Sequence, residues 1–361
     1  MRLILASLVV WTHTVNIAVG NNAVDRLWGG PLRPPLAMVL GMFFCLSGFL
    51  VAGSLERCRT MVSFLGLRII RLVPALAVDT AIAALILGPT FTSLPLAEYF
   101  AHPEFRAYFL NIVGEIHFLL PGVFEYNLQK TVNGQLWTLP YELKCYAVLT
   151  LFGIIGFVRY RWLLLLTVIV AIVLLTGYEL YEAKSLVRFT LYGRALVLCF
   201  LLGNLGYMFR DKIPLSRPLF GLACVAAYGL MMLPGGDYVA LLAIAYVTFY
   251  LGLLTPPRMK IVSSGDYSYG IFLYGYPIQQ AVFQLVGPGF WKNLLLPYPI
   301  IVALAVFSWF MVEKPALRLR TKLFALEVWV QRRALAIPFG HWMVQPPVGP
   351  WLRRPPAREN L

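Results

Sequence analysis

The chain has 361 residues, of which 60% are hydrophobic and only 13% charged, and its formal net charge is +14. Soluble domains carry about 25% charged residues, so this composition excludes an ordinary water-soluble protein and indicates a chain surrounded largely by lipid. The apolar runs are too long and continuous for the short alternating segments of an outer-membrane β-barrel.

A helix needs about 20 apolar residues to cross the hydrocarbon core of a bilayer. Runs of that length predict an all-α polytopic integral membrane protein with about ten transmembrane helices. We expect these helices over residues 3–20, 35–54, 72–89, 136–158, 162–181, 189–209, 217–234, 238–255, 267–286 and 293–312. An eleventh stretch, 105–124, is interrupted by Glu115, His117 and Pro121, and we interpret it as an interfacial or re-entrant element.

The distribution of the basic residues predicts the orientation of these helices. With ten spans and the N-terminus inside, 21 of the 30 lysines and arginines fall on the inner side and 7 on the outer side. The positive-inside rule favours this arrangement, so both termini are predicted to be cytoplasmic, and the net charge reports topology rather than binding of nucleic acid. Residues 1–20 superficially resemble a cleaved signal peptide, but the run is longer than a usual signal core, which favours a retained helix.

The chain is predicted to form one membrane domain over residues 1–315, followed by a basic, proline-rich cytoplasmic tail over 316–361. The tail begins with a basic amphipathic stretch, which we expect to lie on the inner headgroups. The five cysteines show no CxxC spacing and mostly fall within predicted spans, so we predict neither a disulfide framework nor a metal site.

Ionisable residues inside a membrane are costly, so each one is a candidate for function. In the first predicted helix, Arg2 and His13 are eleven residues apart, which places them on one face, roughly 16 Å apart along the axis. His13 is either a hydrogen-bonding side chain that holds two helices together or a general base that faces a cavity.

Two further stretches carry polar groups in or near predicted spans. Ser47 and Gly48 in the second span suit close helix packing. Arg68 and Arg71 lie one helical turn apart at the inner mouth of the third span, and two guanidiniums on one face suit a phosphate. Ordinary positive-inside flanking explains these arginines equally well.

Glu142 lies inside the fourth predicted span, five residues after Trp137. Its charge is balanced either by Arg194 of the sixth span or by His13, because the nearby Lys144 lies on a different face of the helix. A structural ion pair and a functional role both remain open for Glu142.

Six stretches, taken together and in this order, resemble the membrane-bound acyltransferase-3 family. They are Arg2-x10-His13, FFCLSGFL at 43–50, Arg68-x-x-Arg71 followed by Pro74, WTLPYELKCY at 137–146, GDYSYGIFLYGYP at 265–277 and VEKP at 312–315. The resemblance covers about residues 1–320. One position departs from it, because Gly275 stands where the family often has a second histidine.

The resemblance implies transfer of an acyl group, usually acetyl, from a coenzyme A thioester to a hydroxyl of a sugar in a cell-surface or exported glycan or glycolipid. It makes His13 and Arg2 expected catalytic residues. We expect Glu142 to act with them by orienting His13 or stabilising its cationic form, a role that is our own inference. Arg68 and Arg71 are then expected to bind the donor's phosphates. The matching motifs add residues expected to bind substrate or shape the site, namely Ser47, Asn133, Trp137, Tyr269 and Glu313.

Acyl-CoA, expected as acetyl-CoA, is a donor substrate rather than a permanently bound cofactor. The expected partners are membrane lipids, the sugar or glycolipid acceptor and proteins of polysaccharide or lipopolysaccharide synthesis, in the bacterial cytoplasmic (inner) membrane. Two alternatives remain, a transporter or flippase of a glycan or lipid and a non-catalytic scaffold of envelope polysaccharide synthesis. A transporter predicts translocation that survives His13→Ala, whereas an acyltransferase predicts loss of acylated product in that variant.

Overall fold

The computed structural model describes residues 1–58, 60–157, 160–181, 191, 193–254 and 265–334. Within these residues the fold is helical, with no β-strand and one isolated bridge between Thr92 and Val123. The elements are α1 (Arg2–Ala18), α2 (Asn21–Trp28), α3 (Arg33–Arg57), α4 (Met61–Ile82), η1 (Ala83–Leu87), α5 (Gly88–Phe91), α6 (Leu96–Ala101), α7 (Pro103–Ala107), η2 (Tyr108–Val113), η3 (Gly134–Thr138), α8 (Leu139–Ile154), α9 (Arg161–Tyr181), α10 (Gly193–Met208), α11 (Arg217–Met231), α12 (Gly236–Leu253), α14 (Ser268–Val286), α15 (Phe290–Leu295), α16 (Pro297–Ser308), η5 (Trp309–Glu313), α17 (Lys314–Leu317) and α18 (Arg320–Ala334).

The prediction of an all-helical chain is confirmed, and its apolar helices are typical of a membrane protein. By length and composition, five helical stretches among the described residues are suited to cross a membrane: Arg33–Arg57, Met61–Phe91, Arg161–Tyr181, Gly236–Leu253 and Phe290–Trp329. Shorter apolar helices add α1, α10 and α11. The predicted span at 72–89 begins earlier than expected, because α4 already starts at Met61.

The interrupted stretch at 105–124 forms no long helix. It contains the end of α7, the short 3₁₀ helix η2 and then irregular chain. Tyr108 of η2 and Leu120, Val123 and Phe124 of the irregular chain are buried in one hydrophobic cluster. Phe124 has a positive φ of 57°, which few residues without a glycine's freedom adopt. The breakers Glu115, His117 and Pro121 therefore do what the sequence suggests, and the helix ends before them.

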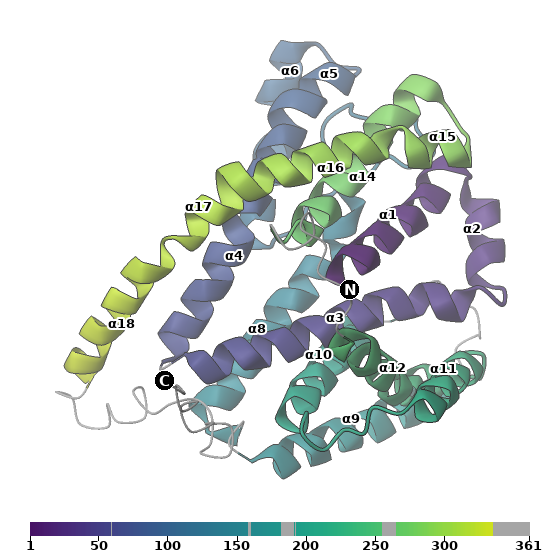
Figure 1. Ribbon diagram of the computed structural model, residues 1–361. Helices are drawn as coiled ribbons and strands as arrows, with labels where there is room; N and C mark the ends of the chain where they lie inside the picture. The colour runs from purple at the N-terminus through teal and green to yellow at the C-terminus, as the bar shows by residue number, and fades with distance from the viewer. Residues whose placement is uncertain (59, 158–159, 182–190, 192, 255–264, 335–361) are drawn as a thin grey trace.

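Helix α3 lies between two groups of helices (Figure 1). On one side it contacts α1, which packs against α14, and α14 in turn packs against α16. On the other side it contacts α10 and α12, and these two helices pack against α9. The candidate site described below lies where α1 and α3 meet α4, α8 and α14.

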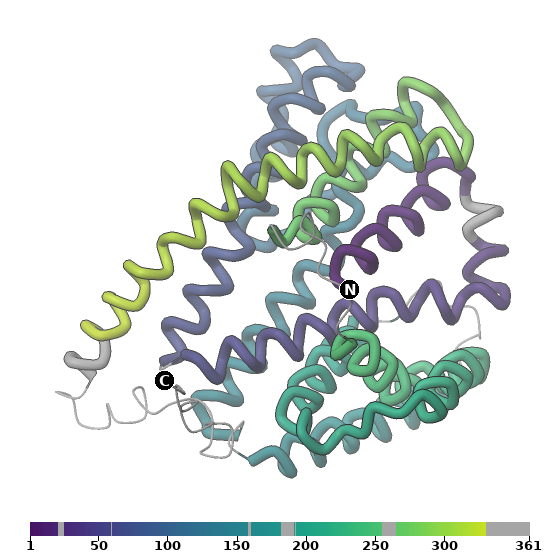
Figure 2. The backbone as a smooth tube through the Cα atoms, viewed as in Figure 1, coloured from purple at the N-terminus to yellow at the C-terminus, as the bar shows by residue number. Residues whose placement is uncertain are grey.

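The last helices follow one another along a nearly straight path from α16 to α18 (Figures 1 and 2). Between α16 and α17 the helix widens into the π-helical turn η5, which ends two residues before Pro315. The missing N–H of this proline removes one regular helical hydrogen bond. This turn carries Glu313, which is only 2% exposed.

Helix α18 packs against the start of α4. The hydroxyl of Thr60, which caps α4 by accepting from the N–H of Ser63, also donates to Glu327 of α18 at 3.1 Å. Part of the predicted tail is therefore an ordered helix against the membrane domain. The domain boundary at 316 stays a prediction, and residues 335–361 lie outside the described residues.

Candidate functional site

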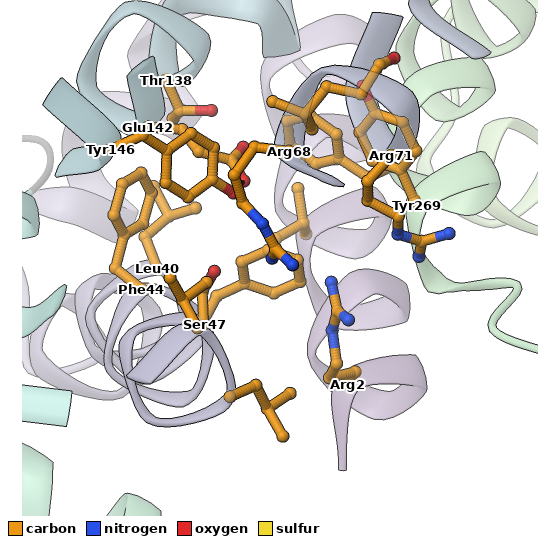
Figure 3. A pocket seen from close by; sticks show the side chains of 16 residues that line it. Arg2, Leu40, Phe44, Ser47, Arg68, Arg71, Thr138, Glu142, Tyr146 and Tyr269 are labelled. Atoms are coloured by element: carbon orange, nitrogen blue, oxygen red, sulfur yellow. Dashed lines mark hydrogen bonds between the residues drawn. The ribbon is translucent and has the colours of Figure 1, made fainter. Parts of the chain in front are cut away.

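A cavity between α1, α3, α4, α8 and α14 brings together six of the ten predicted site residues. It contains about 800 Å³ of empty space, its open mouth included. Its lining comprises Arg2, Val9, Leu40, Phe43, Phe44, Ser47, Leu50, Val51, Arg68, Arg71, Leu72, Thr138, Glu142, Tyr146, Tyr269 and Phe272. The polar groups come from separate helices and project into one space lined otherwise by apolar side chains (Figure 3).

Two of the cavity's arginines are tied into a network of carboxylates. Arg2 of α1 and Arg71 of α4 both bind the same oxygen of Asp266, at 2.8 and 2.7 Å. Arg71 also binds the buried Glu313 of η5 at 2.6 Å. Its guanidinium lies over the ring of Tyr269, 5.6 Å from the centroid, which fixes its orientation further. The network joins four parts of the chain at one end of the cavity.

Asp266 is the member of this network that the sequence analysis did not single out. It lies two residues before α14, outside the predicted spans in which ionisable residues were sought. It is nevertheless the one acidic residue of the GDYSYG stretch. Ser268 donates a hydrogen bond to its other oxygen at 2.5 Å. Burial by itself would raise the pKa of Asp266, but Arg2, Arg71 and Ser268 outweigh burial and hold this pKa below its ordinary value.

Arg68 has different surroundings from Arg71, although both lie on α4. Its guanidinium donates to the hydroxyl of Ser54 at 2.9 Å and lies 5.9 Å from the centroid of the Phe64 ring. Among the described residues no carboxylate forms an ion pair with it. Its Nε atom is buried without a hydrogen-bond partner. Arg68 is therefore the cavity arginine whose charge is least compensated.

Glu142 lies in the first turn of α8, and Tyr146, four residues on, donates to it at 2.5 Å. The spacing of four places both side chains on one helix face, which is a sequence signal for Tyr146 that we missed. Arg194 lies over the ring of Tyr178, and Lys144 lies over that of Tyr141. Glu142 therefore contacts Tyr146, and within the part of the chain that the structure describes no ion pair joins it to Arg194.

His13 lies on α1 outside the lining of this cavity. Its ring packs edge-on against Tyr276 of α14, with 5.1 Å between the ring centroids. The hydroxyl of Tyr276 shares a hydrogen bond of 2.7 Å with that of Thr131. Arg2 and His13 therefore lie apart along α1, as the geometry of an α-helix requires. Among the described residues no hydrogen bond joins His13 to Glu142.

Three other predicted site residues, Asn133, Trp137 and Glu313, also lie outside the cavity lining. Asn133 is fully buried and donates to Asp79 of α4 at 2.7 Å. Trp137 packs edge-on against Tyr141, with 6.1 Å between the ring centroids. Asn133 and Asp79 fix the chain before α8 against α4, and both contacts position the start of the helix that carries Glu142.

Gly275, which replaces a frequent histidine, lies at the contact between α14 and α1. A Cβ atom at this position would be 3.0 Å from a methyl carbon of Val10, a closer contact than nearly all real ones. Any larger side chain here would require Val10 to move. The glycine therefore allows α14 to pack close to the helix that carries Arg2 and His13.

These features define a helical membrane protein with an arginine-rich internal cavity. The model of the acyltransferase-3 family, described as an acyltransferase domain, matches residues 1–313. The chain therefore belongs to this family and is an acyltransferase, as the six sequence stretches predict.

Two curated proteins are similar to the chain over most of their length. An O-acetyl transferase of Shigella phage Sf6 is 26% identical over 329 residues, covering 87% of this chain and 93% of that protein. Nodulation protein 10 of Rhizobium leguminosarum bv. viciae is 26% identical over 345 residues, covering 87% of this chain and 89% of that protein. No solved structure matches the chain.

Proposed function

We propose that the protein transfers an acetyl group from acetyl-CoA to a hydroxyl of a sugar in a cell-surface or exported glycan or glycolipid. The observation that carries this proposal is the cavity, which gathers Arg2, Arg68 and Arg71 around one space. Guanidiniums bind phosphate oxygens through paired, charge-assisted hydrogen bonds, so Arg68, which no carboxylate pairs with among the described residues, suits the phosphates of coenzyme A. Arg2 and Arg71 lie beside it in the carboxylate network. The relative named O-acetyl transferase supports the nature of the acyl group.

The chemistry assigned to His13 is general base catalysis. Its imidazole takes the proton of the acceptor hydroxyl while the hydroxyl oxygen attacks the thioester carbonyl. The carbon–sulfur bond then breaks, and coenzyme A leaves as a thiol after it recovers a proton. Because Arg2 and His13 lie roughly 16 Å apart along α1, the donor has to lie extended, with its phosphates near Arg2 and its thioester towards His13.

The proposed setting is a bacterial inner membrane, with about ten spans and both termini cytoplasmic. The positive-inside distribution of arginines and lysines supports this orientation. The similar proteins from a bacterium and from a phage of a bacterium support a bacterial setting. A cytoplasmic N-terminus places Arg2 and its neighbours on the side where acyl-CoA is made. Membership of an acyltransferase family weighs against the transporter and scaffold alternatives.

Mass spectrometry of glycans and glycolipids tests the proposal, in a host that carries the gene and in one that lacks it. We expect a mass difference of one acetyl group that disappears in His13→Ala. Thr12→Ala is the matched control, because the Thr12 hydroxyl donates to the carbonyl of Val9 in its own helix at 2.7 Å. Acetylated product that persists in His13→Ala membranes would refute the role of this histidine, and no acetylated species in the wild type would refute the proposed reaction.

A further inference from the structure

The ring of His13 is not held by a hydrogen bond to the protein. In the part of the chain that the structure describes, this ring forms neither a hydrogen bond nor an ion pair with another residue. A histidine that acts as a base usually has its ring oriented by a hydrogen bond from its second nitrogen to a carboxylate or a carbonyl. Glu142, the residue expected to orient His13, contacts Tyr146 instead. The orientation of His13 therefore has to come from packing.

The ring that packs against His13 is that of Tyr276 on α14. The two rings are nearly perpendicular, with 74° between their planes and 5.1 Å between their centroids. Aromatic pairs favour this edge-to-face arrangement, and rotation of the imidazole about its Cβ–Cγ bond would drive its atoms into the phenol ring. Gly275 allows the close approach, because a Cβ there would already lie 3.0 Å from Val10 of α1. Tyr276 therefore restricts His13 to a narrow range of orientations.

Tyr276 is itself held from several sides. It is 3% exposed and lies in a buried cluster with Ile17, which is one turn beyond His13 on α1. Its hydroxyl shares a hydrogen bond of 2.7 Å with that of Thr131. Gly134 lies directly against its ring, since a Cβ at this position would be 2.5 Å from a ring carbon. The ring cannot turn away from His13 unless the chain between Thr131 and Gly134 moves.

Gln280 fixes the segment 127–134 to α14. This glutamine is fully buried, and its amide donates to the carbonyls of Gln129 and Thr131 at 2.7 Å each. Asn127 donates to the backbone carbonyl and to the side-chain oxygen of Gln280, at 3.0 Å each. The segment is therefore bound to α14 one helical turn after the tyrosine that its hydroxyl and glycine contact.

The same segment is also attached to α1 and α4. Gln129 donates to Asn16 at 3.3 Å. Asn16 lies three residues after His13, so the two side chains are neighbours on the surface of α1. Asn133 donates to Asp79 of α4 at 2.7 Å. Hydrogen bonds thus attach this segment to three helices, including the one that carries His13.

We infer that Tyr276 is a positioning residue for His13 and that the segment 127–134 holds Tyr276 in place. This inference rests on the proposed function, in which His13 takes the proton of the acceptor hydroxyl, and it assigns to Tyr276 the orienting task expected of Glu142. Tyr276 forms and breaks no bond in the reaction, but it keeps one imidazole nitrogen directed at the acceptor hydroxyl. A misplacement of about 1 Å can lower a reaction rate roughly a hundredfold, so the orientation of this ring affects turnover directly.

The first test measures acetyl transfer by purified full-length protein from radioactive acetyl-CoA to a total extract of host glycans and glycolipids. Tyr276→Leu should lower turnover at saturating acetyl-CoA roughly tenfold or more, with an unchanged KM for acetyl-CoA, because the ring contact is lost. Tyr276→Phe keeps the ring and should restore most of this turnover. Phe283→Leu is the matched control, since Phe283 lies in the same buried cluster and the ring against His13 is that of Tyr276. This control should lower the melting temperature without a selective loss of turnover.

Wild-type turnover in Tyr276→Leu would overturn the inference, and so would equal losses of turnover in Tyr276→Leu and Phe283→Leu. A raised KM for acetyl-CoA at unchanged turnover would also overturn it, because Tyr276 would then be a contact of the donor.

The role of the segment is tested by a double-mutant cycle. Tyr276→Phe and Thr131→Val break the same hydrogen bond, so each should lower turnover by the same small factor, and the double variant should lower it no further. Additive losses would overturn the role of the segment. Both variants leave the two rings in place, so the cycle decides this point even where Tyr276→Leu does not fold.

If the wild type transfers no acetyl group, the proposed function fails, and the orientation of His13 is measured without turnover. In protein with 13C-labelled histidine, the ring signal of His13 is assigned by its loss in His13→Gln. The order parameter of this ring should be about 0.85 in the wild type and in Phe283→Leu, as in rigid parts of a protein, and should fall towards about 0.6 in Tyr276→Leu. An equally rigid ring in Tyr276→Leu would overturn the inference, whether or not the protein is active.

Discussion

Arg68 and Arg71 lie one turn apart on α4, but their surroundings give them different tasks. Arg71 is 16% exposed and neutralised by Asp266 and by Glu313, which is itself 2% exposed. Arg68 has a hydroxyl as its hydrogen-bond partner and keeps its charge available to a ligand. The two arginines of a single sequence motif therefore separate into one that holds helices together and one that is free to bind an anion.

We expect Arg68→Ala to raise the KM for acetyl-CoA at least tenfold with little change in melting temperature. Arg71→Ala should instead lower stability by about 3–5 kcal/mol, because it leaves the buried charge of Glu313 without a partner. Thermal unfolding in detergent and steady-state kinetics measure the two effects. The double variant Arg71→Ala/Glu313→Gln should recover part of the lost stability, since it removes the stranded charge. Equal destabilisation by Arg68→Ala and Arg71→Ala would contradict this division.

At the level of elements, the contact between α3 and α10 depends on two glycines. A Cβ at Gly48 would lie 2.0 Å from the carbonyl oxygen of Phe200, and one at Gly203 would lie 2.0 Å from that of Cys45. The backbones of the two helices therefore touch, as in other small-residue contacts between membrane helices. Ser47, next to Gly48, is positioned in the cavity by this contact, so the packing interpretation of the Ser47-Gly48 stretch and its role in the site are connected.

Gly48→Val should separate α3 from α10 and destabilise the protein by at least the 1–3 kcal/mol typical of overpacking, since backbone rather than a flexible side chain is in the way. Gly221→Val in α11 is the matched control, because no atom lies within 4 Å of a Cβ at that position. The melting temperature in detergent should fall for the first variant alone. A similar fall in both would show that loss of a helical glycine, rather than the close approach, is responsible.

The sequence predicted these elements well and the contacts between them only in part. The length of the apolar runs was enough to predict where the helices lie. The spacing of eleven residues between Arg2 and His13 was enough to predict their separation along α1. Local sequence pattern does not predict the ion pair between Asp266 and Arg2, because the two residues are 264 positions apart in the chain. The contact between Glu142 and Tyr146 is different, because their spacing of four residues is a local signal that the prediction of a partner in His13 or Arg194 overlooked. Motif membership identified the arginines, and only the packing distinguished them.

At the level of the whole molecule, the carboxylate–arginine network joins the start of α1, the middle of α4, the residues before α14 and the turn η5. Asp266 is its most exposed carboxylate, with 34% of its side chain accessible, and it bridges the two arginines. The network therefore links the first helix to the last part of the membrane domain beside the cavity. Its loss should loosen the whole end of the molecule rather than one helix.

The pH dependence of stability reports this network. Because the pKa of Asp266 is below its ordinary value of 3.8 in the folded protein, its contribution is present in full at neutral pH and is lost as pH falls from about that value through the folded pKa. The melting temperature of the wild type should therefore fall below about pH 4. The melting temperature of Asp266→Asn should be lower at neutral pH and should fall less on acidification. Thermal unfolding in detergent between pH 7 and pH 3 measures both curves, with Asp211→Asn as a control for an acidic residue outside the network. Parallel curves for wild type and Asp266→Asn would mean that Arg2 and Arg71 are held at this end of the cavity by groups other than Asp266.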